Sequence, residues 1–473
     1  GDFILRIEDT DQTRFVENAE NYINESLNWC GIVPVESPSV GGQYGPYRQS
    51  ERKEIYKKYA DNLINSGNAY YAFDTPEELE VLRKEYEQRK ELFVYNHLTR
   101  KKLKNSLTLS PDEVNELLSS NKHYVIRFLM PENEELILND LIRKEVRFNT
   151  SELDDKVLFK SDGLPTYHLA NVVDDYLMKI SHVIRGEEWL SSMPLHVLLY
   201  RALGWENDMP FFSHLPLILK PEGQGKLSKR DGDKMGFPVF PLEWISDGGE
   251  VYAGFRENGY LPDALVNFLA LLGWNPGIEK EIFTIDELVE LFSIERIGKA
   301  GSKFDPEKAK WFNHQYMVMK DSHDLALIFK KQLESKNIIT TLEYVEKITS
   351  LVKDRIVLLN DFWKHAFYFF QAPESYDDNI IRKKWKDPVP KQIKDLISLL
   401  SNVEIFTSSE CEKLVKDYIT NENANAGNIF NSLRLCIVGT SMGIHLFDIF
   451  EIIGKEETIN RIKRASDVII KIE

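Results

Sequence analysis

The sequence GLPTYHLANVVDDYLMKISHVIRGEEW, at residues 163–189, predicts a helix followed by a strand and the start of a second helix. A Gly-Leu-Pro turn leads into helical periodicity over residues 165–177, and the apolar run at 180–184 indicates a strand. Farther along, residues 187–203 are predicted as a helix and 215–219 as another strand. Alternating strands and helices are typical of a parallel sheet, so we predict an α/β domain.

The chain before this stretch starts the same α/β domain and then changes in composition. The segment FILRIE at residues 3–8 reads as a buried strand, and helices are predicted over 13–29 and 51–66. Residues 70–162 combine charged helices with short strands. The predicted helices of this region cover 76–90 and 111–119, and its strands cover 124–129 and 157–159. We therefore predict an α+β module inserted into the α/β domain.

The second half of the chain is predicted to be helical. A stretch rich in Gly, Pro and aromatic residues ends at residue 259, and helical patterns dominate from residue 262. Asp305-Pro306-Glu307 is typical of a helix start, with an N-cap carboxylate followed by proline in the first turn. Residues 306–473 therefore read as an all-α region.

The composition indicates a soluble, cytoplasmic globular protein. Hydrophobic residues make up 42% of the 473 residues and charged residues 28%. No apolar run approaches the roughly 20 residues of a membrane span, and the first residues do not read as a secretory signal. The cysteines are Cys30, Cys411 and Cys436, an odd number without a CxxC pair. This spacing argues against a disulfide framework and against a cysteine zinc site.

The net charge of −16 argues against nonspecific nucleic-acid binding, because the field of the whole protein repels phosphate. A locally basic footprint stays compatible with this total. Lysine- and arginine-rich segments occur at residues 100–104, 298–310 and 382–386. Each of them can also be read as a solvated charged face.

Three polar clusters follow predicted strands. Glu8 follows the first strand, Arg185 follows the strand at 180–184, and the loop GKLSKRD at 225–231 follows the strand at 215–219. Ligands of open parallel sheets bind at the carboxyl ends of the strands. We therefore expect the three clusters to lie on one edge of one sheet.

The lysine-rich loop favours binding of a polyphosphate. Mobile ammonium groups and backbone N–H groups in a glycine-containing loop can follow the charge that develops on a leaving pyrophosphate. Lys226 and Lys229 flank Ser228 in this loop. The alternative interpretation is a solvated basic loop, since short motifs of this kind also arise by chance.

Two further groups could hold a small ligand. Tyr167 and Asn171 are four residues apart on a predicted helix and share a face, where they could form a hydrogen-bonding wall or simply pack and face solvent. Arg185 could form a bidentate pair with a ligand carboxylate, or an internal salt bridge with Glu187 or Glu188.

The acidic turn after the first strand also has two interpretations. Glu8, Asp9 and Asp11 could bind a metal, or form a polar turn in which Glu8 anchors an ammonium group. No Ser-His-Asp or Cys-His arrangement is indicated, and His168 and His182 are interpreted as structural. Chemistry based on positioning phosphate and carboxylate groups needs no protein nucleophile.

In combination and in this order, several segments resemble the bacterial-type glutamyl-tRNA synthetases, a class I aminoacyl-tRNA synthetase family. The resemblance covers nearly the whole chain, and KLSKR at 226–230 corresponds to the family's KMSKS signature. The other matching segments are FILRIEDTD at 3–11, YRQSER at 47–52, residues 163–175, HVIRGEEW at 182–189, residues 259–274, residues 304–313 and the tail at 433–454.

The resemblance implies a fold and a domain order. Residues 1–70 and 163–234 would form a Rossmann-like catalytic domain, interrupted by an acceptor-stem-binding domain at 71–162. Residues 235–305 would contact the inner stem, and the all-α region at 306–473 would bind the anticodon. A monomer is expected.

The same resemblance implies a reaction and its participants. ATP, accompanied by Mg²⁺, and L-glutamate would form glutamyl-adenylate, and the glutamyl group would then pass to tRNA(Glu). Family members usually need bound tRNA for the first step. The short paralogues that glutamylate a modified tRNA base lack the helical anticodon module, which this chain has.

By position in the family motifs, each candidate residue also receives a role. Glu8 would hold the substrate ammonium, Arg185 the side-chain carboxylate, and Trp189 would wall the pocket. The other glutamate-binding residues would be Tyr167 and Asn171. Lys226 and Lys229 would act in catalysis on the pyrophosphate. The residues expected near ATP or the tRNA 3′ end are Glu188, Lys226, Ser228, Lys229 and Arg230.

The sequence departs from the family pattern in two places. The HIGH-type motif stands well before the position of Glu8 in the family, whereas seven residues precede Glu8 here. We therefore expect the sequence to be N-terminally incomplete and, taken literally, inactive. Ala72-Phe73-Asp74 stands where some relatives carry a zinc-binding Cys-x-Cys pair, so no zinc is expected. The alternative function is a noncatalytic or differently specific synthetase-like tRNA-binding protein.

Overall fold

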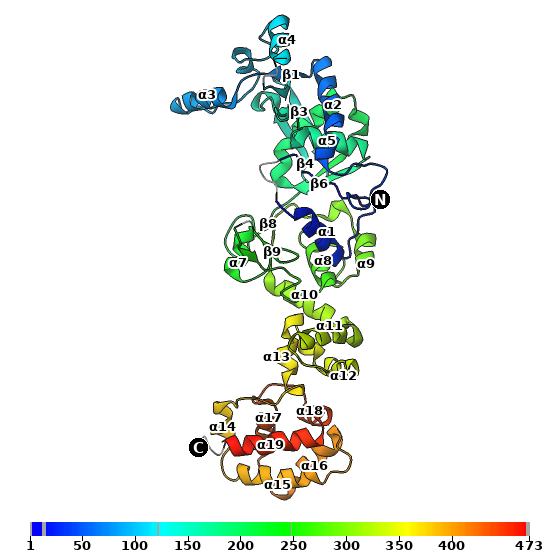
Figure 1. Cartoon of the computed structure of the whole chain (residues 1–473), viewed down its shortest axis with the longest axis vertical. Coiled ribbons are helices and arrows are strands. Elements are labelled where there is room, and N and C mark those ends of the chain that lie inside the picture. Colours follow the sequence, from blue (N-terminus) through cyan, green and yellow to red (C-terminus); the bar gives the residue numbers. More distant parts are fainter. Residues whose placement is uncertain (1, 12–15, 121–122, 247, 470–473) are drawn as a thin grey trace. The chain divides into compact units, whose positions relative to one another are not determined.

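The computed structural model describes residues 2–11, 16–120, 123–246 and 248–469 (Figure 1). The chain folds into two compact units. The first comprises residues 1–237, 244–252 and 266–305, and the second comprises 238–243, 253–265 and 306–473. The unit boundary at residue 305 coincides with the helix start at Asp305-Pro306-Glu307.

A four-stranded sheet lies at the centre of the first unit, in the order β4 (Lys144–Asn149), β3 (Glu135–Asp140), β7 (Phe211–Leu215), β6 (His182–Gly186). The neighbours β6 and β7 run parallel, as the alternation of strands and helices predicts. The strand β3 joins β7 in parallel through the pair Asp140 and Phe212, and it forms an antiparallel hairpin with β4. The sheet therefore combines strands of the α/β domain with a hairpin from the inserted segment.

Two predictions about strands are wrong. The second strand of the α/β domain is β7, at 211–215, and not 215–219; Pro216 has no N–H with which to continue the ladder. Residues 218 and 219 form β8 (Ile218–Leu219), which pairs with β11 (Ser302–Lys303) in a separate two-stranded sheet. The prediction missed β7 because Ser213 and His214 are polar, although both are fully buried in the structure.

The segment predicted as the first buried strand is extended but forms only isolated bridges. Ile4 bridges Glu36, and Ile7 bridges Arg48, both in parallel. These partners belong to two separate irregular segments, so no continuous ladder forms, and most of the segment's side chains are half-buried. Together with the placement of β8, this contradicts the expectation that Glu8, Arg185 and the lysine loop follow strands of one sheet.

Helices α2 (Lys53–Asn65), α5 (Tyr167–Leu177) and α6 (Met193–Ala202) share one apolar core with strands of the sheet, and α1 (Ala19–Trp29) contacts the loop at 44–52 through the ion pair of Glu20 with Arg48. Asp174 of α5 is fully buried and accepts hydrogen bonds from Gln49, Arg52 and Tyr56 at 2.8–3.0 Å. A buried carboxylate with these partners fixes the loop at 44–52 against α5.

The inserted segment contributes a three-stranded antiparallel sheet and two capped helices. The sheet has the order β1 (Ala69–Ala72), β2 (Val125–Phe128), β5 (Val157–Phe159). Both α3 (Pro76–Gln88) and α4 (Pro111–Ser119) begin with proline in the first turn and a capping box, formed by Thr75 with Glu78 and by Ser110 with Glu113. These start signals explain why the sequence predicts both helices closely.

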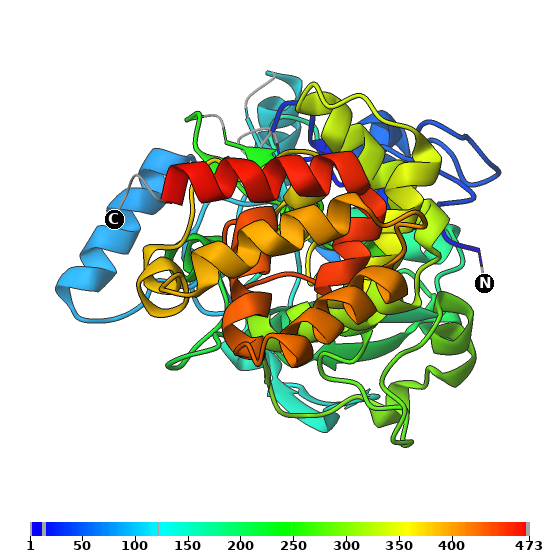
Figure 2. The same ribbon diagram turned by 90° about the horizontal axis from the view of Figure 1, so that it is seen from below.

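The second unit is helical and has its own apolar core. Its helices are α10 (Pro306–Met319), α11 (Ser322–Ser335), α12 (Leu342–Val352), α13 (Phe362–Ala366), α14 (Asp378–Lys384), α15 (Val389–Ser401), α16 (Ser408–Asn421), α17 (Ala426–Val438), α18 (Leu446–Ile453) and α19 (Lys455–Ile469). In both views α19 lies beside α15 (Figures 1 and 2). The core includes the stacked rings of Phe329 and Phe362, 3.9 Å apart. In the part of the chain that the structure describes, no helix has the length and apolarity needed to cross a membrane.

Candidate active site

A pocket of about 470 Å³ brings together the predicted glutamate-binding residues of the first unit. They come from four different segments of the chain. Helix α5 contributes Tyr167 and Asn171, strand β6 contributes Arg185, and the 3-10 turn at Glu187–Ser192 contributes Trp189. Glu8 reaches the same pocket from the N-terminal segment. The predicted shared face of Tyr167 and Asn171 is therefore the face that lines the pocket.

The guanidinium of Arg185 is held by neutral groups. Its Nε donates to Nε2 of His214 at 3.0 Å, and its Nη1 donates to the hydroxyl of Tyr167 at 3.0 Å. Its Nη2 is buried and has no hydrogen-bond partner among the described residues. The alternative interpretation, a salt bridge to Glu187 or Glu188, is wrong. Those two carboxylates pair with other side chains.

Glu8 provides an exposed carboxylate in the pocket. Its Oε1 accepts hydrogen bonds from Nη2 of Arg6 at 3.1 Å and from Nδ2 of Asn171 at 3.2 Å. The Glu8 side chain is 41% exposed, so a ligand can reach it. Asn171 is 8% exposed, which contradicts the alternative that it faces solvent. The pocket thus offers a carboxylate and an uncompensated guanidinium to one ligand.

Arg6 and Asp175 form an ion pair beneath Glu8 that the sequence did not single out. Nη1 of Arg6 lies 3.0 Å from Asp175. Burial raises the pKa of Asp175 to about 6, although Arg6 opposes the rise. Burial lowers the pKa of Arg6, but Asp175, Asp174 and Glu8 outweigh it and the net pKa is raised. The adjacent carboxylates on a mostly apolar helix were the signal that such a partner exists.

Aromatic rings close one side of the pocket. The rings of Tyr167 and Trp189 are tilted against each other with centroids 4.7 Å apart. Burial raises the pKa of the Tyr167 hydroxyl, so it stays protonated at neutral pH. The hydroxyl therefore accepts from Arg185 and keeps a proton of its own to donate.

The lysine loop at 225–231 contacts the turn that carries Trp189, through Glu188. Lys226 forms an ion pair with Glu188, and this pair lowers the pKa of Glu188. Backbone N–H and Oγ of Ser228 both donate to Asp231, at 2.9 and 2.5 Å. Asp231 belongs to helix α7 (Lys229–Met235), so the loop is tied to the helix that follows it.

Asp231 also pairs with Lys220, which precedes the lysine loop. Nζ of Lys220 lies 2.9 Å from Asp231. The hydrogen bonds from Ser228 and Lys220 lower the pKa of Asp231 to about 2. Lys229 and Arg230 are exposed at the start of α7. The fold thus fixes the base of the loop and leaves its cationic side chains at the surface.

Comparison with known proteins assigns this arrangement to a family. Residues 1–311 match the family of class I tRNA synthetases (E and Q), catalytic domain, and residues 323–466 match an anticodon binding domain. A glutamate–tRNA ligase of Flavobacterium johnsoniae is 58% identical over 98% of this chain and 92% of the relative. The chain belongs to the glutamyl-tRNA synthetase family.

Other members of the family agree with this assignment. A glutamate–tRNA ligase of Porphyromonas gingivalis is 54% identical over 99% of this chain and 92% of its own length. The crystal structure of a glutamate tRNA ligase from Elizabethkingia meningosepticum, in complex with its amino acid, is 48% identical with a TM-score of 0.96. That match covers 99% of this chain and 93% of the other. The fold described above is therefore a class I catalytic fold followed by a helical anticodon-binding region.

The acidic turn after Glu8 is tied up in contacts within the protein. Asp9 accepts hydrogen bonds from the backbone N–H and Oγ of Ser50 at 2.8 and 2.5 Å. Among the described residues, no group of three or more His, Cys, Asp or Glu side chains could hold a metal ion. Asp74, at the position of the family's zinc-binding pair, accepts from Lys104 N–H at 2.9 Å and from Tyr95 Oη at 3.0 Å. The hydrogen bonds of Asp9 to Ser50 match the interpretation of this segment as a polar turn.

One of the three basic segments is partly structural. Arg100 is 7% exposed and donates to Asp155 and to the carbonyl of Met130. Lys101 pairs with Glu132 at 3.3 Å. In the segment at 382–386, Trp385 is fully buried while Arg382 and Lys383 are exposed. The third segment can present charge to a nucleic acid, whereas Arg100 serves to hold the inserted segment together.

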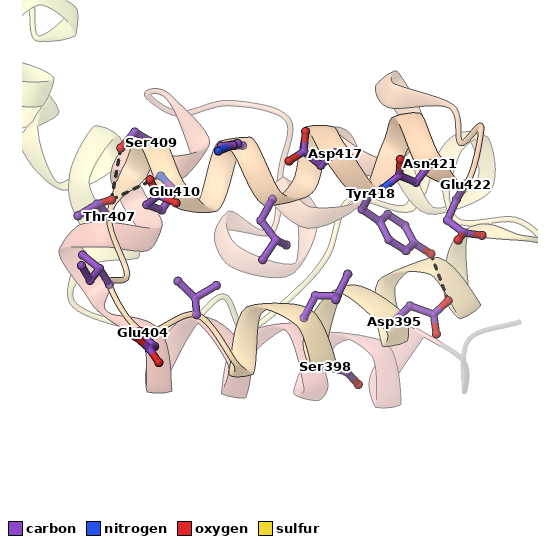
Figure 3. Close-up of a pocket in the computed structure, with 15 residues that line it drawn as sticks. Asp395, Ser398, Glu404, Thr407, Ser409, Glu410, Asp417, Tyr418, Asn421 and Glu422 are labelled. Atoms are coloured by element: carbon purple, nitrogen blue, oxygen red, sulfur yellow. Dashed lines mark hydrogen bonds between the residues drawn. The ribbon is translucent and has the colours of Figure 1, made fainter.

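A larger cavity in the second unit has the opposite charge. It measures about 1200 Å³ and lies between α15 and α16 (Figure 3). Its acidic lining residues are Asp395, Glu404, Glu410, Asp417 and Glu422, with Lys413 as the single basic residue. Tyr418 donates to Asp395 at 3.1 Å within it. None of the motifs found in the sequence lies in this cavity, so the volume of a cavity does not by itself identify the candidate active site.

Proposed function

We propose that this protein attaches L-glutamate to tRNA(Glu) in two ATP-dependent steps. In the first step a carboxylate oxygen of glutamate attacks the α-phosphorus of ATP, and pyrophosphate leaves. In the second step a ribose hydroxyl of the terminal adenosine attacks the carbonyl carbon of the adenylate, and AMP leaves. The proposal is supported by the pocket geometry and by the 52–58% identity to glutamate–tRNA ligases.

The observation that carries the proposal is that the guanidinium of Arg185 has no carboxylate partner among the described residues. Its described hydrogen-bond partners are a tyrosine hydroxyl and histidine rings, so no carboxylate in direct contact neutralises it. A buried guanidinium with a free Nη2 favours a ligand carboxylate, because charge-assisted hydrogen bonds are stronger than neutral ones. Glutamate carries such a group on its side chain, whereas glutamine does not.

The remaining pocket residues have roles that follow from their contacts. Glu8 would hold the substrate ammonium, and Asn171 orients Glu8 through its 3.2 Å hydrogen bond. The hydroxyl of Tyr167 would donate to the substrate, and Trp189 would cover its aliphatic chain. In these assignments, each side chain contacts the protein with one part and the substrate with another.

The lysine loop would act on the phosphates. Lys226 and Lys229 would stabilise the negative charge that moves onto pyrophosphate, with Ser228 and Arg230 near ATP. Glu188, now paired with Lys226, would exchange this partner when ATP or the tRNA end arrives. Mg²⁺ would enter bound to ATP, since it keeps several waters and substrate phosphates as ligands.

The tRNA would be bound by the remaining regions. Residues 71–162 would contact the acceptor stem, 235–305 the inner stem, and 306–473 the anticodon. The match of residues 323–466 to an anticodon binding domain supports the last of these. A noncatalytic or differently specific tRNA-binding protein is the alternative. It finds no specific support, because Glu8, Tyr167, Asn171 and Arg185 surround one pocket.

The test is glutamate-dependent exchange of pyrophosphate into ATP by the full-length gene product, with and without tRNA(Glu). We expect exchange with tRNA(Glu) present. Absence of exchange under both conditions would contradict a catalytic function and favour the noncatalytic alternative.

Replacing Arg185 tests the role of its guanidinium. We expect Arg185→Ala to raise the KM for glutamate roughly 10- to 100-fold, because a charged hydrogen bond contributes about 1.5–3 kcal/mol. Arg201→Ala is a matched control: Arg201 lies on α6 and pairs at the surface with Glu134. Unchanged KM and kcat for glutamate in Arg185→Ala would rule out its assigned role.

A further inference from the structure

Behind Arg185 lies a buried chain of two more polar side chains. His214 and Asp140 have fully buried side chains, and Nδ1 of His214 lies 2.7 Å from Oδ2 of Asp140. Nε2 of the same ring accepts the hydrogen bond from Nε of Arg185 at 3.0 Å. The three residues therefore form a continuous chain from the pocket to the strand β3.

The chain determines the tautomer of His214. Nε of Arg185 carries a hydrogen and can only donate, so Nε2 of His214 must present a lone pair. The ring hydrogen is then on Nδ1, where it donates to Asp140. An imidazolium would place two N–H groups opposite each other at Arg185. The arrangement thus requires a neutral His214 and an acceptor at Asp140.

Asp140 is held in place as an acceptor. Its Oδ1 accepts from the backbone N–H groups of Ile142 at 2.9 Å and Arg143 at 2.7 Å. Burial raises the pKa of Asp140, but the hydrogen bonds from His214 and these backbone groups outweigh it, and the net pKa is lowered. The carboxylate therefore stays ionised at neutral pH and keeps the orientation that His214 needs.

Asp140 belongs to the inserted segment and not to the α/β strands. It ends β3, and its backbone pairs with Phe212 of β7. Arg143, in the turn that follows, donates from Nε to the carbonyl of His214 at 3.3 Å and pairs with Glu187 at 2.6 Å. One hairpin of the inserted segment thus supports both the strand below Arg185 and the turn that carries Trp189.

We propose that Asp140 and His214 are positioning residues that aim the guanidinium of Arg185 and thereby set the enzyme's selection of glutamate over glutamine. This proposal rests on the proposed function of the pocket. His214 occupies Nε of Arg185 and Tyr167 contacts Nη1, which leaves Nη2 without a partner among the described residues and available for a ligand carboxylate. Because the support is neutral where it touches Arg185, the positive charge is retained for the substrate carboxylate.

A purely structural role is the alternative, in which the contact only joins β3 to β7. The two roles differ in what a substitution changes. A structural contact affects stability and all substrates together. A positioning contact raises the KM for glutamate and narrows the preference for glutamate over glutamine, while the KM for ATP stays constant.

Asp140→Asn tests the positioning role with little change of volume. Its Oδ1 can still accept from the backbone N–H groups, but its NH₂ group now donates to Nδ1 of His214. The ring hydrogen then moves to Nε2, opposite Nε–H of Arg185, and this hydrogen bond is lost. We expect the KM for glutamate to rise at least about tenfold, as for a buried donor left without its partner, with a smaller change in kcat.

Two substitutions of His214 form a matched pair. His214→Gln can place an amide oxygen near the position of Nε2 and keep the acceptor for Arg185. His214→Asn keeps only a donor near the position of Nδ1. We expect His214→Gln to retain a lower KM for glutamate than His214→Asn.

Asp155→Asn serves as the control, because Asp155 is also a fully buried carboxylate, paired with Arg100 and Tyr70 away from the pocket. It is expected to lower the melting temperature without changing the KM for glutamate. Equal KM values in wild type and folded Asp140→Asn would overturn the positioning role while leaving the proposed function intact. A wild type that does not bind glutamate would contradict the proposed function itself.

A measurement on the wild type keeps the proposal testable if the variants do not fold. Nitrogen-15 NMR of histidine-labelled protein is expected to show the Nδ1–H tautomer for His214. An Nε2–H tautomer or an imidazolium at neutral pH would overturn the proposed chain of hydrogen bonds.

Discussion

Arg6 and Arg185 line the same pocket but have differently compensated charges. Arg6 contacts Asp174, Asp175 and Glu8, so carboxylates of the protein itself compensate its charge. Arg185 contacts neutral groups and keeps its charge. The sequence indicated Arg185 but not Arg6 as a candidate, and the partners of each side chain in the structure show that Arg185 is the one able to bind a ligand carboxylate.

The lysine loop allows a test at the level of single residues. We expect Lys229→Ala to lower the rate of ATP–pyrophosphate exchange by roughly 100-fold, as for the loss of one contact that stabilises transition-state charge. Lys234→Ala is the control, because Lys234 is an exposed lysine on the same helix α7. Equal losses of exchange rate in the two variants would show that the total positive charge, and not the position of Lys229, determines the rate.

The buried histidines predict a pH dependence of stability. Burial lowers the pKa of His168 to about 4, and Nδ1 of His168 lies 3.1 Å from Nε2 of His196. Below the usual histidine pKa near 6.5 the unfolded chain binds a proton that the folded protein does not, so stability falls as pH decreases from about 6.5 to about 4.

The measurement is the midpoint of urea unfolding between pH 7 and pH 4. We expect wild type to lose stability over this range, and His168→Gln to lose less, because glutamine does not titrate. An identical pH profile for both proteins would exclude His168 as the group responsible.

At the scale of elements, local signals in the sequence were sufficient for helices and insufficient for several strands. Capping residues and proline mark the starts of α3, α4 and α10, and the structure places these starts where the sequence predicts them. The hairpin of β3 and β4 was not predicted, and β7 was predicted four residues too late. Strand pairing depends on partners far away in the sequence, and polar residues such as His214 hide a buried strand.

One side chain joins elements within the helical unit. Asn313 of α10 is fully buried; it accepts from Leu261 N–H at 2.7 Å and donates to the carbonyl of Val357 at 2.5 Å. We expect Asn313→Ala to lower the free energy of unfolding of this unit by about 2–3 kcal/mol, because two buried backbone groups lose their partner. Chemical denaturation followed by circular dichroism measures the change.

Asn360→Ala is the matched control for that substitution. Asn360 is exposed, and its Nδ2 donates to the carbonyl of Glu257 at 2.7 Å. Its replacement is expected to change the free energy of unfolding by no more than about 0.5 kcal/mol. A comparable loss in both variants would contradict the special role of Asn313.

At the scale of the whole molecule, a net charge of −16 requires that tRNA binding depend on local basic surfaces. Ile381 of α14 and Trp385, which directly follows the helix, are buried and anchor this segment, while Arg382, Lys383 and Lys386 are exposed. We expect the double variant Lys383→Ala with Lys386→Ala to bind tRNA(Glu) more weakly. The slope of log affinity against log salt concentration is expected to fall in magnitude by about one for each phosphate contact that is lost.

The acidic cavity provides the control for this experiment. Lys413 lines the acidic cavity, and Lys416 pairs with Glu412 on the same helix α16. Lys413→Ala with Lys416→Ala removes the same number of charges from a surface that repels phosphate. Equal weakening of tRNA binding by both double variants would contradict a specific role for the basic segment at 382–386.

The sequence by itself determined the family, the α/β domain, the inserted segment and the helical second half, because motifs, caps and periodicity are local properties of the chain. It also indicated Glu8, Tyr167, Asn171 and Arg185, whose spacing matches one family pattern. Only the tertiary structure decided how these charges are compensated. Arg6 is neutralised by carboxylates on α5, whereas Arg185 is supported by His214 and, behind it, by Asp140 from the inserted hairpin. The physical reason is that the charge available to a ligand depends on which groups surround a side chain in space, and those groups come from distant positions in the sequence.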